Sequence, residues 1–207
     1  EEVTNPISAP VRQQLMDTFG AALAQADLVI ISDYAKGCVP PDMIAEITAA
    51  TRAAGKMVVV DPKLADFSAY AGASLLTPNL SEFRKTGITA GNSLDDIAKA
   101  ASVLATNHGM YAILVSLSAR GMLLARADGN WHHAPAQARE VFDVSGAGDT
   151  VIAMLAAALA GGVEMEHAVT LANMAASVVV GKSGTAIASP GEIILMAGAP
   201  TPPTGWD

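Results

Sequence analysis

The order of segments in the first half of the chain constrains its fold more than any other feature. Stretches of helical composition are followed by short runs of consecutive apolar residues, at 28–31, 57–60, 75–76 and 113–115. These runs do not alternate apolar with polar residues, so we expect both faces of each strand to be buried. Helices are predicted between them at about 11–25, 42–54 and 94–107, the last with Ser93 as its N-cap. Short buried strands separated by helices predict an α/β domain with a mostly parallel sheet.

The pattern changes after residue 115. Two short apolar segments, 121–125 and 131–134, flank Asp128-Gly129, which is typical of the turn in a β-hairpin. Two alanine-rich helices are predicted at about 150–160 and 165–180. The end of the chain, 198–207, is rich in proline and is expected to be a frayed tail or the start of a linker. We therefore predict one domain at 1–197 and a tail at 198–207.

Composition narrows the class of protein. The 207 residues are 51% hydrophobic and 15% charged, which favours a folded domain over disorder. A net charge of -8 without a Lys/Arg cluster argues against a nucleic-acid partner. The longest apolar run, at 151–160, is too short to span a bilayer. The only cysteine, Cys38, is expected to be a buried apolar side chain, and with no signal segment at the start we expect a cytoplasmic protein without membrane attachment.

One segment carries a clear chemical signal, at 143–150. Gly146, Ala147 and Gly148 precede a long apolar helix, so their amides can converge on an anion and the helix dipole reinforces them. Asp149 follows at once. A carboxylate repels a bound phosphate, but it is useful there if it must accept a proton from a neighbouring hydroxyl. The alternative is that Asp149 is an ordinary acidic residue in the first turn of a helix.

The same segment, Asp-Val-Ser-Gly-Ala-Gly-Asp-Thr, resembles the C-terminal signature of the ribokinase-like (PfkB) carbohydrate kinases. Three other motifs follow the order of that family: Ser-Asp-Tyr-Ala-Lys-Gly at 32–37, Asp-Pro-Lys at 61–63 and Thr-Pro-Asn-Leu-Ser-Glu at 77–82. These three are similar to those of bacterial heptose-7-phosphate kinases, which act in ADP-heptose synthesis for the lipopolysaccharide core. The resemblance implies a ribokinase-like three-layer α/β/α sandwich with a mostly parallel sheet.

The resemblance also implies roles for the residues of two motifs. Asp149 would be the catalytic base, and the amides of Gly146, Ala147 and Gly148 would form the anion hole. An Asn-x-x-Glu element would organise the phosphates of ATP and, through water bound to Glu82, a Mg²⁺ ion; it comprises Asn79, Leu80, Ser81 and Glu82. Oxygen donors suit such a hard ion. Alternatively, Asn79 is a helix N-cap and Glu82 its capping-box partner, and the two roles can coexist.

The nucleotide is expected to lie beyond the carboxyl ends of the strands. Ser116 ends one of them, and the resemblance assigns Ser116, Ser118 and Gly121 to the phosphates and ribose of ATP. It places Asn173 near the adenine, although a polar residue among alanines is also typical of a helix–helix hydrogen bond. Lys63 would offset phosphate charge, or it is simply a surface lysine at a strand end.

Two further groups of residues follow strand or loop ends. Asp143 and Ser145 resemble positions around a monovalent-cation site, which implies K⁺, although Asp143 can equally cap its loop. Three residues after the first strand would face either the sugar phosphate or the nucleotide, and the sequence leaves both open: Asp33, Tyr34 and Lys36.

The expected reaction is transfer of the γ-phosphoryl group of ATP to the anomeric hydroxyl of D-glycero-β-D-manno-heptose 7-phosphate. The alternatives are a related kinase for another sugar or a nucleoside, or a catalytically idle nucleotide-binding or dimerisation fragment. The family's N-terminal strands, lid and most sugar-binding residues have no counterpart before Ser32. We therefore expect this chain to be truncated and poorly active or inactive, and the full-length protein to form a homodimer.

Overall fold

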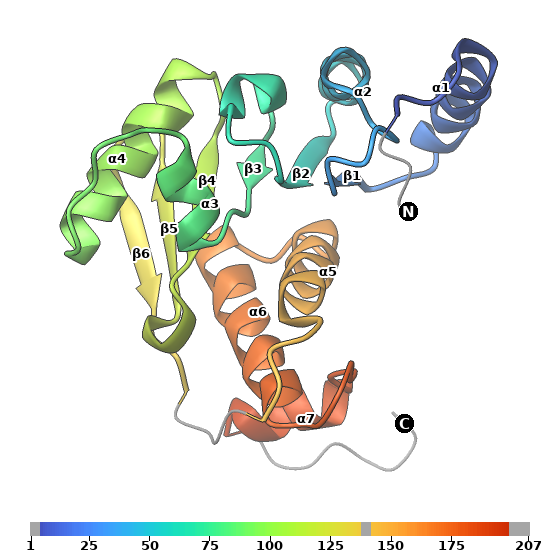
Figure 1. Cartoon of the computed structure of the whole chain (residues 1–207). Coiled ribbons are helices and arrows are strands. Elements are labelled where there is room, and N and C mark those ends of the chain that lie inside the picture. Colours follow the sequence, from blue (N-terminus) through green and yellow to red (C-terminus); the bar gives the residue numbers. More distant parts are fainter. Residues whose placement is uncertain (1–4, 138–141, 199–207) are drawn as a thin grey trace. The chain divides into compact units, whose positions relative to one another are not determined.

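The computed structural model describes residues 5–137 and 142–198 (Figure 1). The chain divides into two compact units, which are described separately. The first comprises Glu1–Ser116 and Leu123–His132, and the second comprises Leu117–Met122 and His133–Asp207. Most of the predicted tail at 198–207 lies outside the described residues, so its boundary stays a prediction.

The first unit contains most of a sheet whose strands follow one another in chain order. They are β1 (Leu28–Ser32), β2 (Met57–Asp61), β3 (Leu75–Leu76), β4 (Ala112–Ser116), β5 (Met122–Arg126) and β6 (Trp131–Ala134). The first four pair in parallel, with Leu28 opposite Met57 and Leu75 opposite Ala112. This confirms the predicted mostly parallel α/β sheet.

The apolar runs form the centre of this sheet. All residues from Val58 to Val60 and from Ala112 to Val115 are fully buried. Both faces of β2 and β4 are therefore covered, as expected for strands that do not alternate apolar with polar residues. β1 lies at one edge of the sheet, and its Ile30 is 44% exposed. The predicted hairpin joins β5 to β6, where the Arg126 amide donates to the Asn130 carbonyl at 2.9 Å.

Four α-helices and a 3-10 helix complete the first unit. They are α1 (Ala9–Leu23), α2 (Pro41–Ala53), η1 (Phe67–Tyr70), α3 (Leu80–Lys85) and α4 (Leu94–Asn107). The Ser93 hydroxyl accepts from the Asp96 amide at 3.1 Å and starts α4 at the predicted residue. α4 packs against β4 (Figure 1). Cys38, predicted to be buried, is instead exposed in the loop after β1.

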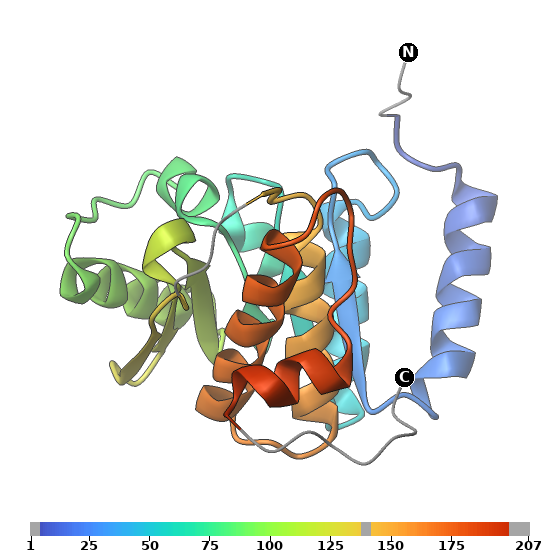
Figure 2. The same ribbon diagram turned by 90° about the horizontal axis from the view of Figure 1, so that it is seen from below.

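The second unit consists mainly of helices α5 (Ala147–Ala160), α6 (Met165–Val180) and α7 (Pro190–Met196), with a 3-10 turn η2 (Ser118–Arg120). α5 and α6 lie side by side, and α7 packs on α6 (Figure 2). Small buried side chains, among them Ala156 and Ala172, let the first two helices approach closely. Within the part of the chain that the structure describes, no helix is long and apolar enough to cross a bilayer.

Two helix starts differ from the sequence predictions. α5 begins at Ala147 rather than near Thr150, because Gly146 adopts a left-handed φ of 77° and becomes the N-cap. α7 was not predicted at all. It is started by a capping box, in which the Glu192 carboxylate accepts from the Ser189 amide at 2.9 Å.

Candidate functional site

Several predicted site residues lie at the carboxyl edge of the parallel sheet in the first unit. Lys63 follows β2, Asn79 follows β3, and Ser116 ends β4. Asn79 and Ser116 form an isolated parallel bridge, and the Ser116 amide donates to the Pro78 carbonyl at 3.0 Å. The structure therefore brings these residues to the edge at which open α/β sheets bind their ligands.

Asn79 and Glu82 form the capping box that the sequence offered as one alternative. The Asn79 Oδ1 accepts from the Glu82 amide at 2.9 Å, and the Glu82 Oε2 accepts from the Asn79 amide at 3.0 Å. The second carboxylate oxygen, Oε1, accepts from the Lys63 Nζ at 3.1 Å. In the same first turn of α3, Leu80 is half-buried and Ser81 is exposed. Two different partners thus fix the orientation of the buried Glu82 carboxylate.

This arrangement fits a Mg²⁺ ion held through water. A carboxylate offers about four lone-pair sites, and the two partners of Glu82 occupy only some of them. The Asn79 Oδ1 is already an acceptor in the capping box. A hard divalent ion that keeps several waters could therefore be bound by Glu82 through one of those waters, without breaking the start of α3.

The residues after β1 separate into a buried one and two exposed ones. Asp33 is 6% exposed. Its Oδ1 accepts from the Ala35 amide at 2.7 Å, and its Oδ2 accepts from the Tyr70 hydroxyl at 2.5 Å. Tyr34 and Lys36 are exposed in the same loop. The structure therefore uses the Asp33 carboxylate inside the protein and leaves the other two side chains at the surface.

Tyr70 was missed by sequence reasoning. It lies in η1, is fully buried, and accepts from the amides of Lys63 and Leu64 at 3.0 Å each. Burial, together with the bond to Asp33, raises the pKa of the Tyr70 phenol, so it remains a donor. Its polar neighbours, Asp66 and Ser68, bond to each other, and its main partner is 37 positions away. No local signal could have identified it.

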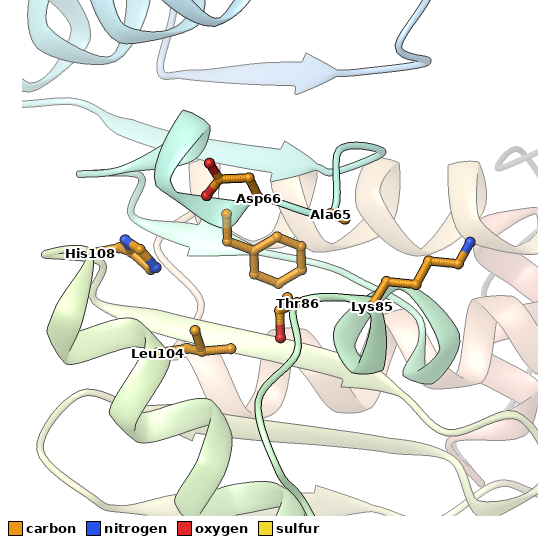
Figure 3. Close-up of a pocket in the computed structure, with 7 residues that line it drawn as sticks. Ala65, Asp66, Lys85, Thr86, Leu104 and His108 are labelled. Atoms are coloured by element: carbon orange, nitrogen blue, oxygen red, sulfur yellow. The ribbon is translucent and has the colours of Figure 1, made fainter.

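A hollow of about 300 Å³ lies elsewhere in the first unit, near η1 and the ends of α3 and α4 (Figure 3). Its lining residues are Ala65, Asp66, Phe67, Lys85, Thr86, Leu104 and His108. Asp66 accepts from the Ser68 amide, and Figure 3 shows the Lys85 side chain pointing away from His108. None of the predicted site residues lines this hollow.

In the second unit, the start of α5 is open to solvent. Gly148 and Asp149 are exposed, and a Cβ placed on Gly148 would meet no atom within 4 Å. The N-cap, Gly146, has no side chain to cap the helix, and amides in a first turn lack intrahelical acceptors. The Ala147 amide donates to the Val144 carbonyl at 3.2 Å, so one of the three predicted anion-hole amides already has an acceptor within the loop.

The loop before α5 is held by its own hydrogen bonds. The Asp143 Oδ1 accepts from the Ser145 amide at 2.9 Å, which matches the alternative in which Asp143 caps the loop. This bond lowers the pKa of the Asp143 carboxyl below its ordinary value. The Phe142 amide donates to the Val180 carbonyl at the end of α6 at 2.8 Å. The loop that presents Gly146 is therefore tied to α6.

Gly121 and Asn173 both contact the segment around Pro135. Gly121 has a φ of 85°, and a Cβ there would lie 2.0 Å from the Ala134 carbonyl oxygen. The Asn173 Nδ2 donates to the Pro135 carbonyl at 2.8 Å, so this buried amide does make a structural hydrogen bond. Ser118 belongs to the same unit and has a left-handed φ of 53°, whereas Ser116 belongs to the first unit.

The first unit has an Asn-x-x-Glu element at the carboxyl edge of a mostly parallel sheet, where open α/β folds bind their ligands. The second unit has a helix whose start is formed by Gly-Ala-Gly-Asp, and amides at such a helix start can bind a phosphate. Residues 3–191 match the sequence profile of the pfkB family carbohydrate kinase. The chain belongs to this family.

Curated relatives agree with the family assignment. The chain is 45% identical over 194 residues to the bifunctional protein HldE of Paramagnetospirillum magneticum, and this match covers 94% of the chain and 40% of that relative. It is 51% identical over 185 residues to the bifunctional protein HldE of Halorhodospira halophila, which covers 89% of the chain and 38% of that relative. The chain thus spans about two fifths of the length of these relatives.

Solved structures support the fold. Phosphofructokinase-2 from Escherichia coli in complex with potassium superposes with a TM-score of 0.79 at 20% identity, covering 93% of this chain and 63% of that protein. Arabidopsis thaliana ribokinase complexed with ribose and ATP superposes with a TM-score of 0.71 at 25% identity, and the match covers 81% of this chain and 54% of that protein. The predicted ribokinase-like α/β fold is confirmed.

Proposed function

We propose that this chain is the nucleotide-binding and catalytic part of an ATP-dependent kinase that phosphorylates the anomeric hydroxyl of a heptose 7-phosphate. The observation that carries the proposal is the exposed Asp149 in the first turn of α5, directly after the exposed Gly148 and close to the left-handed N-cap Gly146. Membership of the pfkB family supports a carbohydrate as the phosphoryl acceptor.

In this proposal, the Asp149 carboxylate accepts the proton of the sugar hydroxyl as its oxygen attacks the γ-phosphorus. The bond between that phosphorus and the β,γ-bridging oxygen breaks, and ADP leaves. The amides at the start of α5 donate to the oxygens of the transferring group, where the helix dipole also favours negative charge. The loop that leads into these amides is held by the Asp143 cap and by the bond from Phe142 to Val180.

The first unit contributes the residues that would organise the nucleotide. Bound through water to Glu82, Mg²⁺ would neutralise charge on the phosphate oxygens. Lys63 holds its ammonium 3.1 Å from the same carboxylate and adds positive charge at this edge. Ser116 is proposed to contact the nucleotide from the end of β4. In the second unit, Ser118, Gly121 and Asn173 are proposed to do so.

Heptose 7-phosphate is proposed as the acceptor because the motifs at 32–37, 61–63 and 77–82 resemble those of bacterial heptose kinases. The 45% and 51% identities to bifunctional proteins HldE point the same way. A kinase for another sugar or a nucleoside is the second candidate, favoured by the likeness to ribokinase. We further propose that the full-length protein is a cytoplasmic homodimer. We also propose that a K⁺ ion binds near Asp143 and Ser145.

The proposal is tested by replacing Asp149 with Asn in the full-length protein. General-base catalysis contributes about 10²–10⁴-fold to rate, so kcat should fall by about that factor while the Kd for ATP, measured by calorimetry, stays unchanged. Asp95→Asn is the matched control, because Asp95 also lies in the first turn of a helix, α4. ADP release would be followed with heptose 7-phosphate, fructose 1-phosphate, ribose and a nucleoside. A wild-type protein that turns over none of them refutes the proposal.

A further inference from the structure

The buried Tyr70 hydroxyl joins the loops that follow β1 and β2. It donates to the Asp33 Oδ2 at 2.5 Å and accepts from the Lys63 and Leu64 amides at 3.0 Å each. A phenol has one proton to donate and a limited acceptor capacity, so these partners use its hydrogen-bonding capacity. Tyr70 itself is held in η1, which the Asp66 side chain caps at the Ser68 amide.

Packing alone does not account for the Tyr70 hydroxyl. The Tyr70 ring is fully buried and meets the Phe67 ring edge-to-face, with centroids 6.2 Å apart. A phenylalanine would fill the same space without a polar atom to desolvate, and a buried hydroxyl is costly unless it is bonded. Its partners all belong to the two loops that carry the Ser32–Gly37 and Asp61–Lys63 motifs. The hydroxyl therefore serves those loops.

On the β1 side, Tyr70 completes the hydrogen bonding of Asp33. The other oxygen of that carboxylate binds the Ala35 amide at 2.7 Å and so supports the left-handed φ of 52° at Ala35. This turn sets the direction of the loop that exposes Tyr34. Without the Tyr70 donor, the buried Asp33 carboxylate would keep only its bond to the Ala35 amide. Asp33 would then be held less firmly, and so would the turn at Ala35.

On the β2 side, Tyr70 fixes the backbone from which the Lys63 side chain extends. The Lys63 side chain is 55% exposed, yet its Nζ lies 3.1 Å from the Glu82 Oε1. A long exposed lysine has many rotamers, and anchoring its own amide keeps those that reach Glu82 accessible. The contacts thus run in sequence from Tyr70 to Lys63, then to Glu82 and the Asn79 amide.

We infer that Tyr70 is a positioning residue: its hydroxyl sets the Lys63 ammonium against Glu82 and so prepares the nucleotide-phosphate side of the site. The inference rests on the proposed function in one respect, namely that the ligand near Lys63 and Glu82 is a nucleotide phosphate. The placement of Lys63 by Tyr70 is a separate statement about the folded protein, so it has its own test.

The first test measures acylation of lysines in the full-length protein with an amine-reactive reagent, read by mass spectrometry. Tyr70→Phe should raise the Lys63 rate at least threefold, towards the rate in Glu82→Gln, while Lys85 and Lys99 react as before. Thr51→Val is the control, because it removes another fully buried hydroxyl, bonded to the Ile47 carbonyl at 2.8 Å within α2. A Lys63 rate that does not change overturns the inference.

Asp33→Asn covers the case in which Tyr70→Phe does not fold. It retains the shape of Asp33 and weakens its bond with Tyr70, so the Lys63 rate should rise in the same direction by a smaller factor. Circular dichroism and thermal melting identify the variants that are folded. If folded Asp33→Asn leaves the Lys63 rate unchanged while Glu82→Gln raises it, the inference is equally refuted.

The second test is a double-mutant cycle on phosphoryl transfer. Tyr70→Phe and Lys63→Met should each raise the KM for MgATP about 5- to 10-fold with a smaller change in kcat, and the double variant should equal Lys63→Met alone. Independent multiplication of the two effects would mean that Tyr70 does not act through Lys63, against the inference. An inactive wild type would refute the proposed function instead, and the acylation test would still decide the placement of Lys63.

Discussion

Replacing Gly121 with Ala tests whether the turn after β4 tolerates any side chain. A Cβ at this position would lie 2.0 Å from the Ala134 carbonyl oxygen, 2.5 Å from the Ala136 nitrogen and 2.7 Å from the Pro135 carbonyl carbon. All three are backbone atoms, so relief requires movement of a whole segment rather than rotation of a side chain. The φ of 85° adds strain for any residue other than glycine.

Two terms set the magnitude. The left-handed backbone costs alanine about 1–2 kcal/mol, and forcing atoms into a packed region costs about 1–3 kcal/mol more. Gly121→Ala should therefore lower the free energy of unfolding by about 2–5 kcal/mol. For a domain of about 150–250 residues, each kcal/mol corresponds to about 2–4 °C in Tm. The clash alone should thus lower Tm by several degrees.

Gly129→Ala separates the two terms. Gly129 has a φ of 89° in the hairpin turn, but a Cβ there would meet nothing within 4 Å. The loss of stability in Gly129→Ala should therefore come from backbone strain alone. Urea and thermal denaturation of the full-length protein, with both variants measured side by side, provide the assay. If Gly121→Ala is no less stable than Gly129→Ala, the steric reasoning about this turn is wrong.

Two other predictions concern helix starts. Hydrogen bonding to Lys182, then to the Ser189 amide, lowers the pKa of Glu192 to about 2 from an ordinary 4.5. Because the folded-state pKa is depressed, this stabilisation is present above about pH 4.5 and is lost as pH falls towards 2. Both side chains are more than a third exposed, so Glu192→Gln should lower stability at pH 7 by less than about 1 kcal/mol, and a Tm difference that stays constant from pH 7 to 2.5 contradicts this assignment. At α4, Ser93→Ala removes the cap on the Asp96 amide, and with it the bond from the Ser93 hydroxyl to the Asp96 carboxylate, and should cost about 1 kcal/mol. Ser93→Thr keeps a hydroxyl and should restore the cap, so equal melting of the two variants would show that the cap contributes nothing.

The fold was predictable where a single pattern determined the local structure. The runs at 57–60 and 113–115 contain no polar residue to suggest an exposed face, and they form the buried centre of the sheet. The start of α5 was placed too late because glycine is a poor helix former, whereas the left-handed Gly146 in fact supplies the N-cap. α7 was overlooked because it is short and begins with Pro190-Gly191, a pair that usually indicates a turn.

The candidate site was predictable only in its local motifs. The capping box joins Asn79 and Glu82, which are three positions apart, so their spacing alone was enough to suggest it. The partnership of Asp33 with Tyr70 was not, because it forms only when two loops meet in the folded chain. Cys38 was expected to be buried on the general tendency of its residue type, but it lies in an exposed loop. Long-range contacts of this kind leave no periodic trace in a sequence.

The double engagement of Glu82 restricts which substitutions this position can accept. Aspartate, one methylene shorter, would retain the charge but could not reach both the Asn79 amide and the Lys63 ammonium from the same backbone. Glutamine would retain the reach but lose the charge. The start of α3 and the charge at this edge of the sheet therefore depend on one side chain, and neither substitution at this position would preserve both.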